Sequence, residues 1–236
     1  MSQQKDRITM EKRYQRTALI TGGDGIEKLK SAAVAVFGLG GVGGYAAEAL
    51  ARSGIGTMAL VDNDIIDETN LNRQILALQS TLGRRKTELM KERILDINPD
   101  ACVDTYDMFF LPENSDDFDF DGYDYIVDAV DTVAAKTELA VKAREAGIPL
   151  ISAMGTGNKM EAGMFETADI YESAVCPLAR VMRKELRKRG IEHLKIVYSR
   201  EVPLRNDPPG SMPFVPPAAG MIMAGEVVKD ILKEGG

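Results

Sequence analysis

The residues best suited to chemistry begin with a glycine-rich segment. The sequence GLGGVG places Gly38, Gly40 and Gly43 on the pattern G-x-G-x-x-G and adds Gly41. Glycines let backbone N–H groups approach a phosphate, and the amino terminus of a following helix adds a positive dipole. Asp62 ends the next predicted strand, where an acidic residue holds ribose hydroxyls. The segment predicts nucleotide binding but not which nucleotide, and the alternative is a turn that only allows tight packing.

Polar residues farther along favour ATP chemistry over dinucleotide chemistry. They lie at the carboxyl ends of predicted strands or in the loops beyond, where doubly wound sheets bind ligands. Cleavage between the α- and β-phosphates needs cations for the leaving pyrophosphate and a carboxylate for Mg²⁺. Arg73 and Lys86 supply the charge, and Asp131 supplies the metal ligand, although each alone is more often a solvated surface charge. The full candidate set is Asn70, Asn72, Arg73, Gln74, Lys86 and Asp131.

The elements that would position these residues alternate between strand and helix. Apolar runs predict strands over 32–37, 57–61, 102–106, 125–130 and 149–153, and helical periodicity predicts helices over 26–31, 45–52, 84–97 and 134–146. A long polar loop covers 62–79, and an acidic loop covers 112–122. Short crossovers of this kind predict an α/β fold, a Rossmann-like doubly wound and mostly parallel sheet with helices on both faces.

After residue 154 the pattern changes. Strands are predicted over 163–170 and 194–198, a basic helix over 177–189, a proline-rich loop over 203–217 and a last helix over 218–233. We interpret residues 1–236 as a single domain with a mixed carboxyl-terminal portion. Its parts are an N-terminal arm and helix (1–31), a nucleotide-binding half (32–154) and a substrate-side and dimer half (155–236).

Composition narrows the class of protein. The 236 residues carry a formal net charge of −7 with a pI near 5.0, which argues against a bulk nucleic-acid binder. The two cysteines form no CxxC pair, so a four-cysteine zinc site is excluded, and a single histidine makes His-based acid–base chemistry a poor choice. With no signal-like segment and no stretch of about 20 apolar residues, a cytoplasmic protein without a membrane partner is expected.

One segment departs from the acidic average. Residues 180–200 hold eight Lys or Arg and two Glu, a net of +6. Such a helix on an acidic protein predicts a phosphate-binding stripe, and the alternative is a solvated face whose partners lie in the acidic remainder.

In combination and order, these motifs resemble the ThiF/MoeB/HesA superfamily of ubiquitin-activating-type adenylyltransferases. The evidence is GLGGVG, then VDND (61–64), NLNRQ (70–74), Lys86 and DAVD (128–131), preceded by RYQR (13–16). The resemblance implies that the glycines contact ATP, that Asp62 holds its ribose, and that Asn70, Asn72 and Gln74 lie in the nucleotide site. It further implies phosphate contacts from Asn70, Arg73 and Lys86, Mg²⁺ on Asp131, and a homodimer in which Arg16 enters the partner's site.

Within that superfamily, two segments resemble the branch that dehydrates threonylcarbamoyladenosine in tRNA. They are CPLARVMRKELRKRGI (176–191) and VYSREVP (197–203). The resemblance implies ATP-dependent activation of the threonyl carboxylate, followed by cyclisation with loss of water. The basic helix predicted over 177–189 would contact the tRNA through Arg180, Arg183, Lys184, Arg187 and Lys188.

Three other functions stay open. A sulfur-carrier or ubiquitin-like activating enzyme would adenylate a protein's carboxyl-terminal Gly, with Cys176 as an acyl acceptor and a sulfur-transfer or sulfur-carrier protein as partner. A nicotinamide-dependent dehydrogenase would explain GLGGVG and Asp62 but leaves NLNRQ and Lys86 without a role. The third is a nucleotide-sensing protein without enzymatic activity. We expect a non-catalytic Cys176, a Cys102 in the core, and packing roles for Met221 and Met223.

Overall fold

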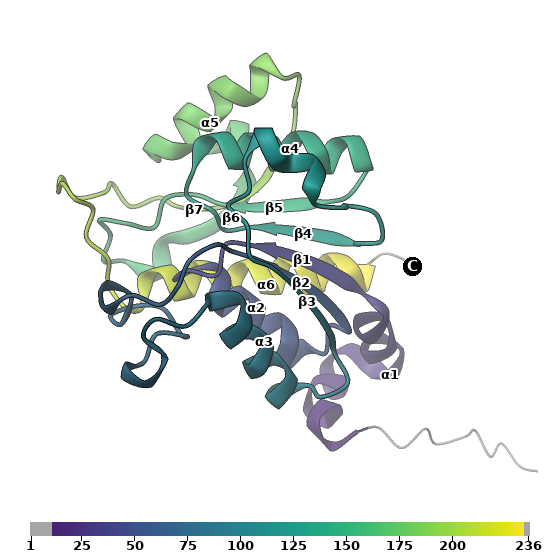
Figure 1. Cartoon of the computed structure of the whole chain (residues 1–236). Helices are drawn as coiled ribbons and strands as arrows, with labels where there is room; N and C mark the ends of the chain where they lie inside the picture. Colours follow the sequence, from purple (N-terminus) through teal and green to yellow (C-terminus); the bar gives the residue numbers. More distant parts are fainter. Residues whose placement is uncertain (1–10, 234–236) are drawn as a thin grey trace, which may run out of the picture.

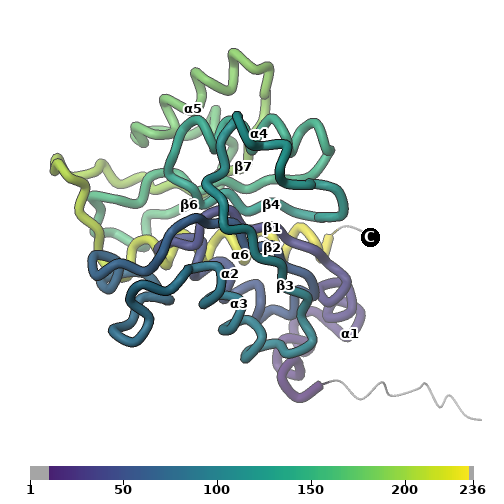
Figure 2. Tube along the Cα trace, in the orientation of Figure 1, coloured from purple at the N-terminus to yellow at the C-terminus, as the bar shows by residue number. Residues whose placement is uncertain are grey.

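One sheet of seven strands organises the molecule (Figures 1 and 2). A computed structural model describes residues 11–233; residues 1–10 of the predicted N-terminal arm, and 234–236, lie outside the described residues. The strand order is β3-β2-β1-β4-β5-β7-β6, and every neighbouring pair is parallel except β6 and β7. The strands are β1 (Ala33–Phe37), β2 (Thr57–Val61), β3 (Cys102–Tyr106), β4 (Tyr125–Asp128), β5 (Leu150–Ala153), β6 (Phe165–Asp169) and β7 (Lys195–Ser199).

The strand order identifies the fold. From β1 the chain proceeds outward through β2 and β3, and then crosses back to β4 on the other side of β1. This reversal between β1 and β4 is the switch point of a doubly wound sheet, where a crevice opens at the carboxyl ends of the strands. The predicted Rossmann-like fold with a mixed carboxyl-terminal portion is therefore confirmed, and β6 and β7 extend the same sheet.

Helices cover both faces of the sheet (Figure 1). One face packs against α1, α2, α3 and α6, and the other packs against α4 and α5. The helices are α1 (Gln15–Ser31), α2 (Gly43–Ser53), α3 (Lys86–Ile97), α4 (Val133–Ala146), α5 (Pro177–Lys188) and α6 (Val215–Lys233), with short 3₁₀ turns between them. No helix within residues 11–233 has the length and apolar character needed to cross a membrane.

Several predicted elements differ in their bounds from the observed ones. Helix α1 begins at Gln15 instead of residue 26 and contains a break at Gly22, whose φ is +75°. Helix α6 begins at Val215 and carries two prolines in its first turn, where proline is tolerated because its missing N–H would have no helical partner there. Met223 is buried in the core as expected, whereas Met221 is 47% exposed.

The prediction of a buried Cys102 is wrong. Strand β3 is an edge strand whose residues alternate, so that Val103 is buried against the core and Cys102 points outward and is exposed. The alternating pattern of a five-residue edge strand does not indicate which of its two faces packs against the core. The thiol of Cys102 is therefore a surface group.

The close packing of α6 on α2 gives a testable prediction about stability. A Cβ at Gly220 would lie 2.2 Å from the carbonyl oxygen of Val42, whereas a Cβ at Gly225, in the same helix, would meet nothing within 4 Å. We expect Gly220→Ala to lower the free energy of unfolding by about 1–3 kcal/mol through overpacking. The matched Gly225→Ala variant should be neutral or stabilise by about 0.5–1 kcal/mol. Urea unfolding measures both, and equal effects would contradict the assigned packing.

Candidate active site

A cavity of about 800 Å³ opens at the switch point, between the carboxyl ends of β1, β2, β4 and β5. Its size suits a nucleotide with part of a second ligand. Ten of the residues predicted for nucleotide binding line this one cavity. They are Gly38, Gly40, Gly41, Asp62, Asn70, Asn72, Arg73, Gln74, Lys86 and Asp131.

The glycine segment forms a cradle for an anion. In the described chain, the backbone N–H groups of Gly40, Gly41 and Val42 have no acceptor, and all three residues line the cavity at the amino terminus of α2. Free N–H groups at a helix amino terminus, reinforced by the helix dipole, are the elements of a phosphate site. The geometry therefore fits a nucleotide phosphate at this point.

Gly43 has a different role from the one predicted. It does not belong to the cavity lining, and a Cβ there would lie 1.8 Å from the carbonyl oxygen of Gly38. Gly38 itself has a φ of +85°, and a Cβ at that residue would lie 2.8 Å from the carbonyl oxygen of Ala129. These two glycines let the turn after β1 and the turn after β4 approach each other, while Gly40 and Gly41 face the cavity.

Asp62 ties the glycine segment to the end of β2. Its Oδ2 accepts the backbone N–H of Leu39 at 2.6 Å, and its Oδ1 accepts that of Asp64 at 2.8 Å. Burial raises the pKa of Asp62 above its ordinary value, although the nearby Lys86 charge acts in the opposite direction. Each carboxylate oxygen has a further lone pair. Ribose binding by Asp62 stays a prediction.

The NLNRQ segment holds its own loop together and presents one cation. Asn70 closes a capping box with Asp67 at the 3₁₀ turn that Glu68–Asn70 forms. Arg73 donates from Nη1 to the Thr69 carbonyl at 3.0 Å and to Asn72 Oδ1 at 2.8 Å. Neither acceptor is charged, so the guanidinium keeps its positive charge available for a phosphate. The Oε1 atom of Gln74 is buried without a partner in the described structure.

Lys86 is the first residue of α3, two residues after the predicted start of this helix, and it is already paired. Its Nζ donates to Asp64 Oδ2 at 2.7 Å, and its side chain is 4% exposed. Asp64 itself is exposed. The lysine therefore lies at the cavity wall in a fixed position, and its charge is shared between Asp64 and any anion that enters.

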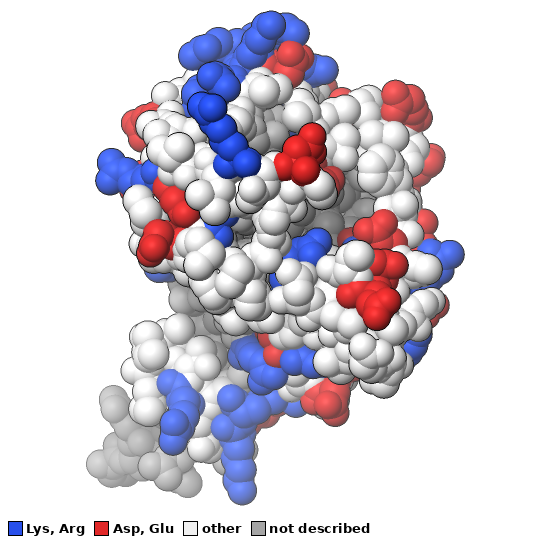
Figure 3. All heavy atoms as spheres, turned by 90° about the vertical axis from the view of Figure 1, so that its left-hand side faces the viewer, with Lys and Arg blue, Asp and Glu red and all other residues white. Residues whose placement is uncertain are grey.

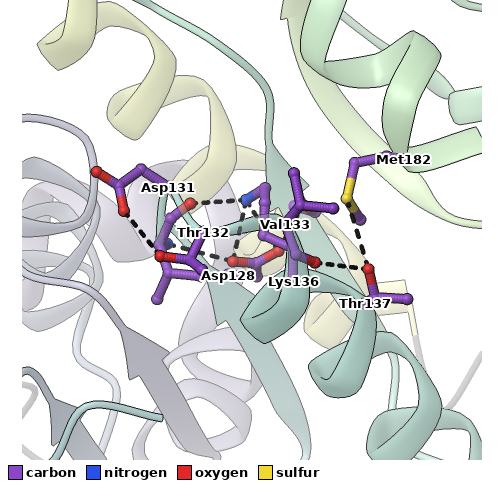
Figure 4. A network of polar contacts seen from close by, with 9 residues as sticks. Asp128, Asp131, Thr132, Val133, Lys136, Thr137 and Met182 are labelled. Atoms are coloured by element: carbon purple, nitrogen blue, oxygen red, sulfur yellow. Dashed lines mark hydrogen bonds and ion pairs between the residues drawn. The ribbon is translucent and has the colours of Figure 1, made fainter. Parts of the chain in front are cut away.

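Asp131 is carried by a turn that a buried ion pair secures (Figure 4). Lys136 Nζ contacts both oxygens of Asp128 at 3.0 Å and the Val130 carbonyl at 2.9 Å, and both charged side chains are 0% exposed. Ser152 on β5 adds a hydroxyl bond to Asp128 at 2.6 Å. These contacts fix the backbone between β4 and α4, so that Asp131 stands exposed at the cavity.

The surroundings of Asp131 fit a magnesium ion that is held mainly by phosphates. Among residues 11–233, only the Thr132 hydroxyl bonds to its carboxylate, at 3.3 Å on Oδ1. Within the described ranges no cluster of three or more His, Cys, Asp or Glu side chains could hold a metal. Mg²⁺ commonly takes one or two carboxylates, with the remaining ligands from waters and substrate phosphates. One free carboxylate opposite a phosphate cradle meets that requirement.

The structure adds residues that the sequence did not indicate. The segment 154–157 after β5, the segment 209–211 and Met108–Phe110 after β3 line the cavity. Asn158 secures the loop that carries 209–211: its N–H donates to the Gly210 carbonyl at 2.8 Å, and its Oδ1 accepts the Gly210 N–H at 2.6 Å. Asn72 also donates to the Ser211 carbonyl at 2.9 Å. This long loop thus closes one wall of the cavity.

Other predicted residues lie elsewhere. Arg16, near the start of α1, is exposed and outside the cavity lining. Cys176 precedes α5, is 3% exposed and is also outside the lining. The basic residues of α5 lie beyond the cavity, which α5 reaches through Leu178 near its amino terminus.

The buried ion pair below Asp131 yields a prediction. Lys136→Met removes one partner of a fully buried pair and leaves the Asp128 charge without compensation, which should cost about 3–5 kcal/mol of unfolding free energy. Lys142→Met on the same helix removes a surface partner of Asp116, and Asp116 is 90% exposed. Chemical denaturation should show little change for this control. Equal, small losses for both variants would refute the role assigned to Lys136.

The chain is similar to proteins of known family over nearly its whole length. The model of the ThiF family matches residues 14–236. The chain is 44% identical over 241 residues to a tRNA threonylcarbamoyladenosine dehydratase of Bacillus subtilis (strain 168), covering 94% of this chain and 95% of that protein. It is 39% identical over 175 residues to the Escherichia coli (strain K12) protein of the same name, of which it spans 65%.

A solved structure extends the likeness to three dimensions. The crystal structure of the E. coli tRNA N6-threonylcarbamoyladenosine dehydratase, TcdA, in complex with ATP superposes with a TM-score of 0.88 at 33% identity, covering 93% of each chain. The glycine cradle, the NLNRQ loop, Lys86 and Asp131 all lie within the span of the family model. The chain therefore belongs to the ThiF family.

Proposed function

We propose that this protein uses ATP to activate the carboxylate of threonylcarbamoyladenosine in tRNA and then cyclises it with loss of water. The observation that carries the adenylation step is the cavity itself, in which a glycine phosphate cradle faces Arg73, Lys86 and Asp131. The tRNA substrate rests on the names of the relatives, above all the B. subtilis protein that matches over nearly its whole length.

In the first step, the substrate carboxylate attacks the α-phosphorus of ATP and pyrophosphate leaves. The nucleophile is already an anion, so that no general base is needed. The N–H groups of the glycine cradle orient the phosphates, and the Arg73 guanidinium compensates the charge that develops on them. Lys86, fixed by Asp64 at 2.7 Å, adds a second positive charge at a set position. Mg²⁺ on Asp131 would supply further charge compensation for the phosphates.

In the second step, a neighbouring group of the same substrate attacks the activated acyl carbon. AMP leaves with the former carboxylate oxygen, the attacking group gives up a proton, and the net change in the nucleoside is the loss of one water. The ring closes within one substrate, so that no enzyme nucleophile is required. This agrees with a site whose cavity-lining residues, as described, include neither cysteine nor histidine.

The sulfur-carrier alternative finds less support in the geometry. An acyl-accepting Cys176 needs access to the cavity, whereas its thiol is 3% exposed and packs in the core beneath α5. We therefore retain the proposal of a non-catalytic Cys176, and with it a substrate that needs no transfer to a thiol.

The basic face of α5 is proposed as the tRNA contact. Figure 3, which faces the left-hand side of Figure 1, shows Lys and Arg side chains gathered at the top, over α5. Arg180, Lys184 and Arg187 recur at i, i+4 and i+7 and share one exposed stripe. Arg183 instead bonds to Ser173 and the Ile170 carbonyl, and Lys188 pairs with Glu185 at 2.7 Å. The first three are thus the strongest candidates for contacts with the tRNA.

The assay that tests the function combines ATP, Mg²⁺ and tRNA bearing threonylcarbamoyladenosine, followed by nucleoside mass spectrometry. We expect ATP-dependent loss of one water from that nucleoside. Arg73→Ala should reduce turnover by about 10²-fold or more, as removal of a charge-stabilising donor does. Its unfolding free energy should stay near that of the wild type, because Arg73 bonds only to its own loop.

A matched control removes a surface arginine of the same region. Arg84 pairs with Glu92 outside the cavity, so that Arg84→Ala should retain full activity. An intact, ATP-binding wild type that leaves the nucleoside unchanged would contradict the proposed substrate. An unfolded Arg73→Ala variant would contradict the assigned role of Arg73.

We further propose a homodimer in which Arg16 acts in the partner's site. On α1, Leu19 and Ile20 are 87% and 89% exposed, so that this helix presents an apolar surface to solvent. The break at Gly22 separates this part of α1 from the segment that packs on the core. Both features suit an arm that lies on a second copy of the chain.

Mixed dimers test this arrangement. If Arg16 acts across the interface, equal amounts of the inactive Arg16→Ala and Arg73→Ala proteins should regain about a quarter of the wild-type activity once their subunits have exchanged. Half of the dimers are then mixed, and each mixed dimer has one complete site out of two. Analytical ultracentrifugation confirms the dimer. A dimeric mixture that stays inactive would show that Arg16 has no such role.

A further inference from the structure

A second hollow lies at the far end of the basic helix α5. Its volume is about 390 Å³, and it is lined by Tyr171, Arg187, Gly190, Ile191 and Glu192. The Arg187 guanidinium lies over the Tyr171 ring, with its central carbon 5.0 Å from the ring centroid. Two flat π surfaces therefore form one stack at the wall of this hollow.

We infer that this hollow receives the base of a nucleotide that lies a few positions from the modified adenosine in the same tRNA strand. The inference rests on the proposed function and identifies a second RNA contact, separate from the ATP cavity. Bases that are not paired stack on aromatic rings and on the planes of arginine side chains. Arg187 is exposed, so that a base can lie against the guanidinium face opposite Tyr171.

The charges at the hollow favour a base over a phosphate. Glu192 contributes an exposed carboxylate to the lining, which repels a phosphate but accepts N–H groups from the edge of a base. Phosphates find their partners on the adjoining stripe, where Arg180 and Lys184 have no carboxylate within ion-pair distance in the described structure. The stripe thus binds phosphates of one RNA strand, and the hollow binds one base of the same strand.

The platform is held firmly. Tyr171 Oη donates to the Ile191 carbonyl at 2.5 Å, which fixes the ring against the turn after α5. Arg144 on α4 holds the same turn through the carbonyls of Arg189 and Gly190, at 3.2 and 2.9 Å. A planar surface that is already ordered loses little entropy when a base stacks on it.

The distance between the two sites suits one strand. Helix α5 touches the ATP cavity through Leu178 and the hollow through Arg187. These positions lie about 14 Å apart along a helix, at 1.5 Å per residue. That separation corresponds to about four stacked nucleotides at 3.4 Å each. A single strand with its modified adenosine in the first site can therefore place a base about four nucleotides away in the second.

The experiment measures the affinity of the full-length protein for tRNA bearing threonylcarbamoyladenosine, with Arg187→Ala, Arg187→Lys and the control Lys229→Ala. Both Arg187 variants should weaken binding about tenfold, near the lower end of the effect of one stacked base. Arg187→Lys keeps the charge, so that the slope of log affinity against log salt should stay as in the wild type. Lys229→Ala, which removes a charge paired with Glu226 on α6, on the other face of the sheet, should change affinity by less than about threefold.

A tRNA with an abasic nucleotide assigns the contact. The abasic position is moved in turn through the nucleotides around the modified adenosine. At one position, loss of the base should weaken wild-type binding about tenfold. The same loss should not weaken the already reduced binding of Arg187→Lys any further. Wild-type affinity in Arg187→Lys, or additive losses at every position, overturns the base site and leaves the proposed function intact. A wild type that neither binds nor converts this tRNA overturns both.

Discussion

The site depends on how closely three backbone segments approach one another at the end of β1. The Gly38 carbonyl lies where the side chain of residue 43 would be. The turn at Ala129 contacts Gly38, and α6 contacts Val42 through Gly220. None of these approaches leaves room for a Cβ. As a result, the amino terminus of α2 stands open at the switch point, and the turns after β1 and β4 border the same cavity.

Much of this could be predicted because parallel strands place their carboxyl ends together. Once β1, β2 and β4 are recognised as buried apolar runs, Gly40, Asp62 and Asp131 must meet at one edge of the sheet. Lys86 joins them because α3 begins at that edge before it descends along the face. The doubly wound order of the strands follows from the same logic, since right-handed crossovers leave few alternatives.

Other parts depend on contacts between segments far apart in sequence, for which no local pattern exists. The wall formed by 209–211 is attached through Asn158 and Asn72, and the sequence around neither residue indicates this distant partner. The Asp128–Lys136 pair is completely buried, although a lysine in an amphipathic helix normally indicates a solvated position. The acidic segment 112–122 likewise supplies Phe118 and Phe120 to a cluster around Phe37, which its charge conceals.

The two cations of the cavity are prepared differently, and this suits a reaction in which charge moves. Lys86 is already ion-paired with Asp64, whereas Arg73 lines the cavity with only uncharged acceptors around it in the described structure. In the proposed mechanism, two unpaired cations would favour tight binding of pyrophosphate, the product that must leave. The pairing of Lys86 would limit that ground-state attraction, and Arg73 would keep its full charge for the phosphates. Asp64 is exposed, so that water can solvate its carboxylate. The Asp64–Lys86 ion pair can therefore weaken as negative charge grows on the phosphates.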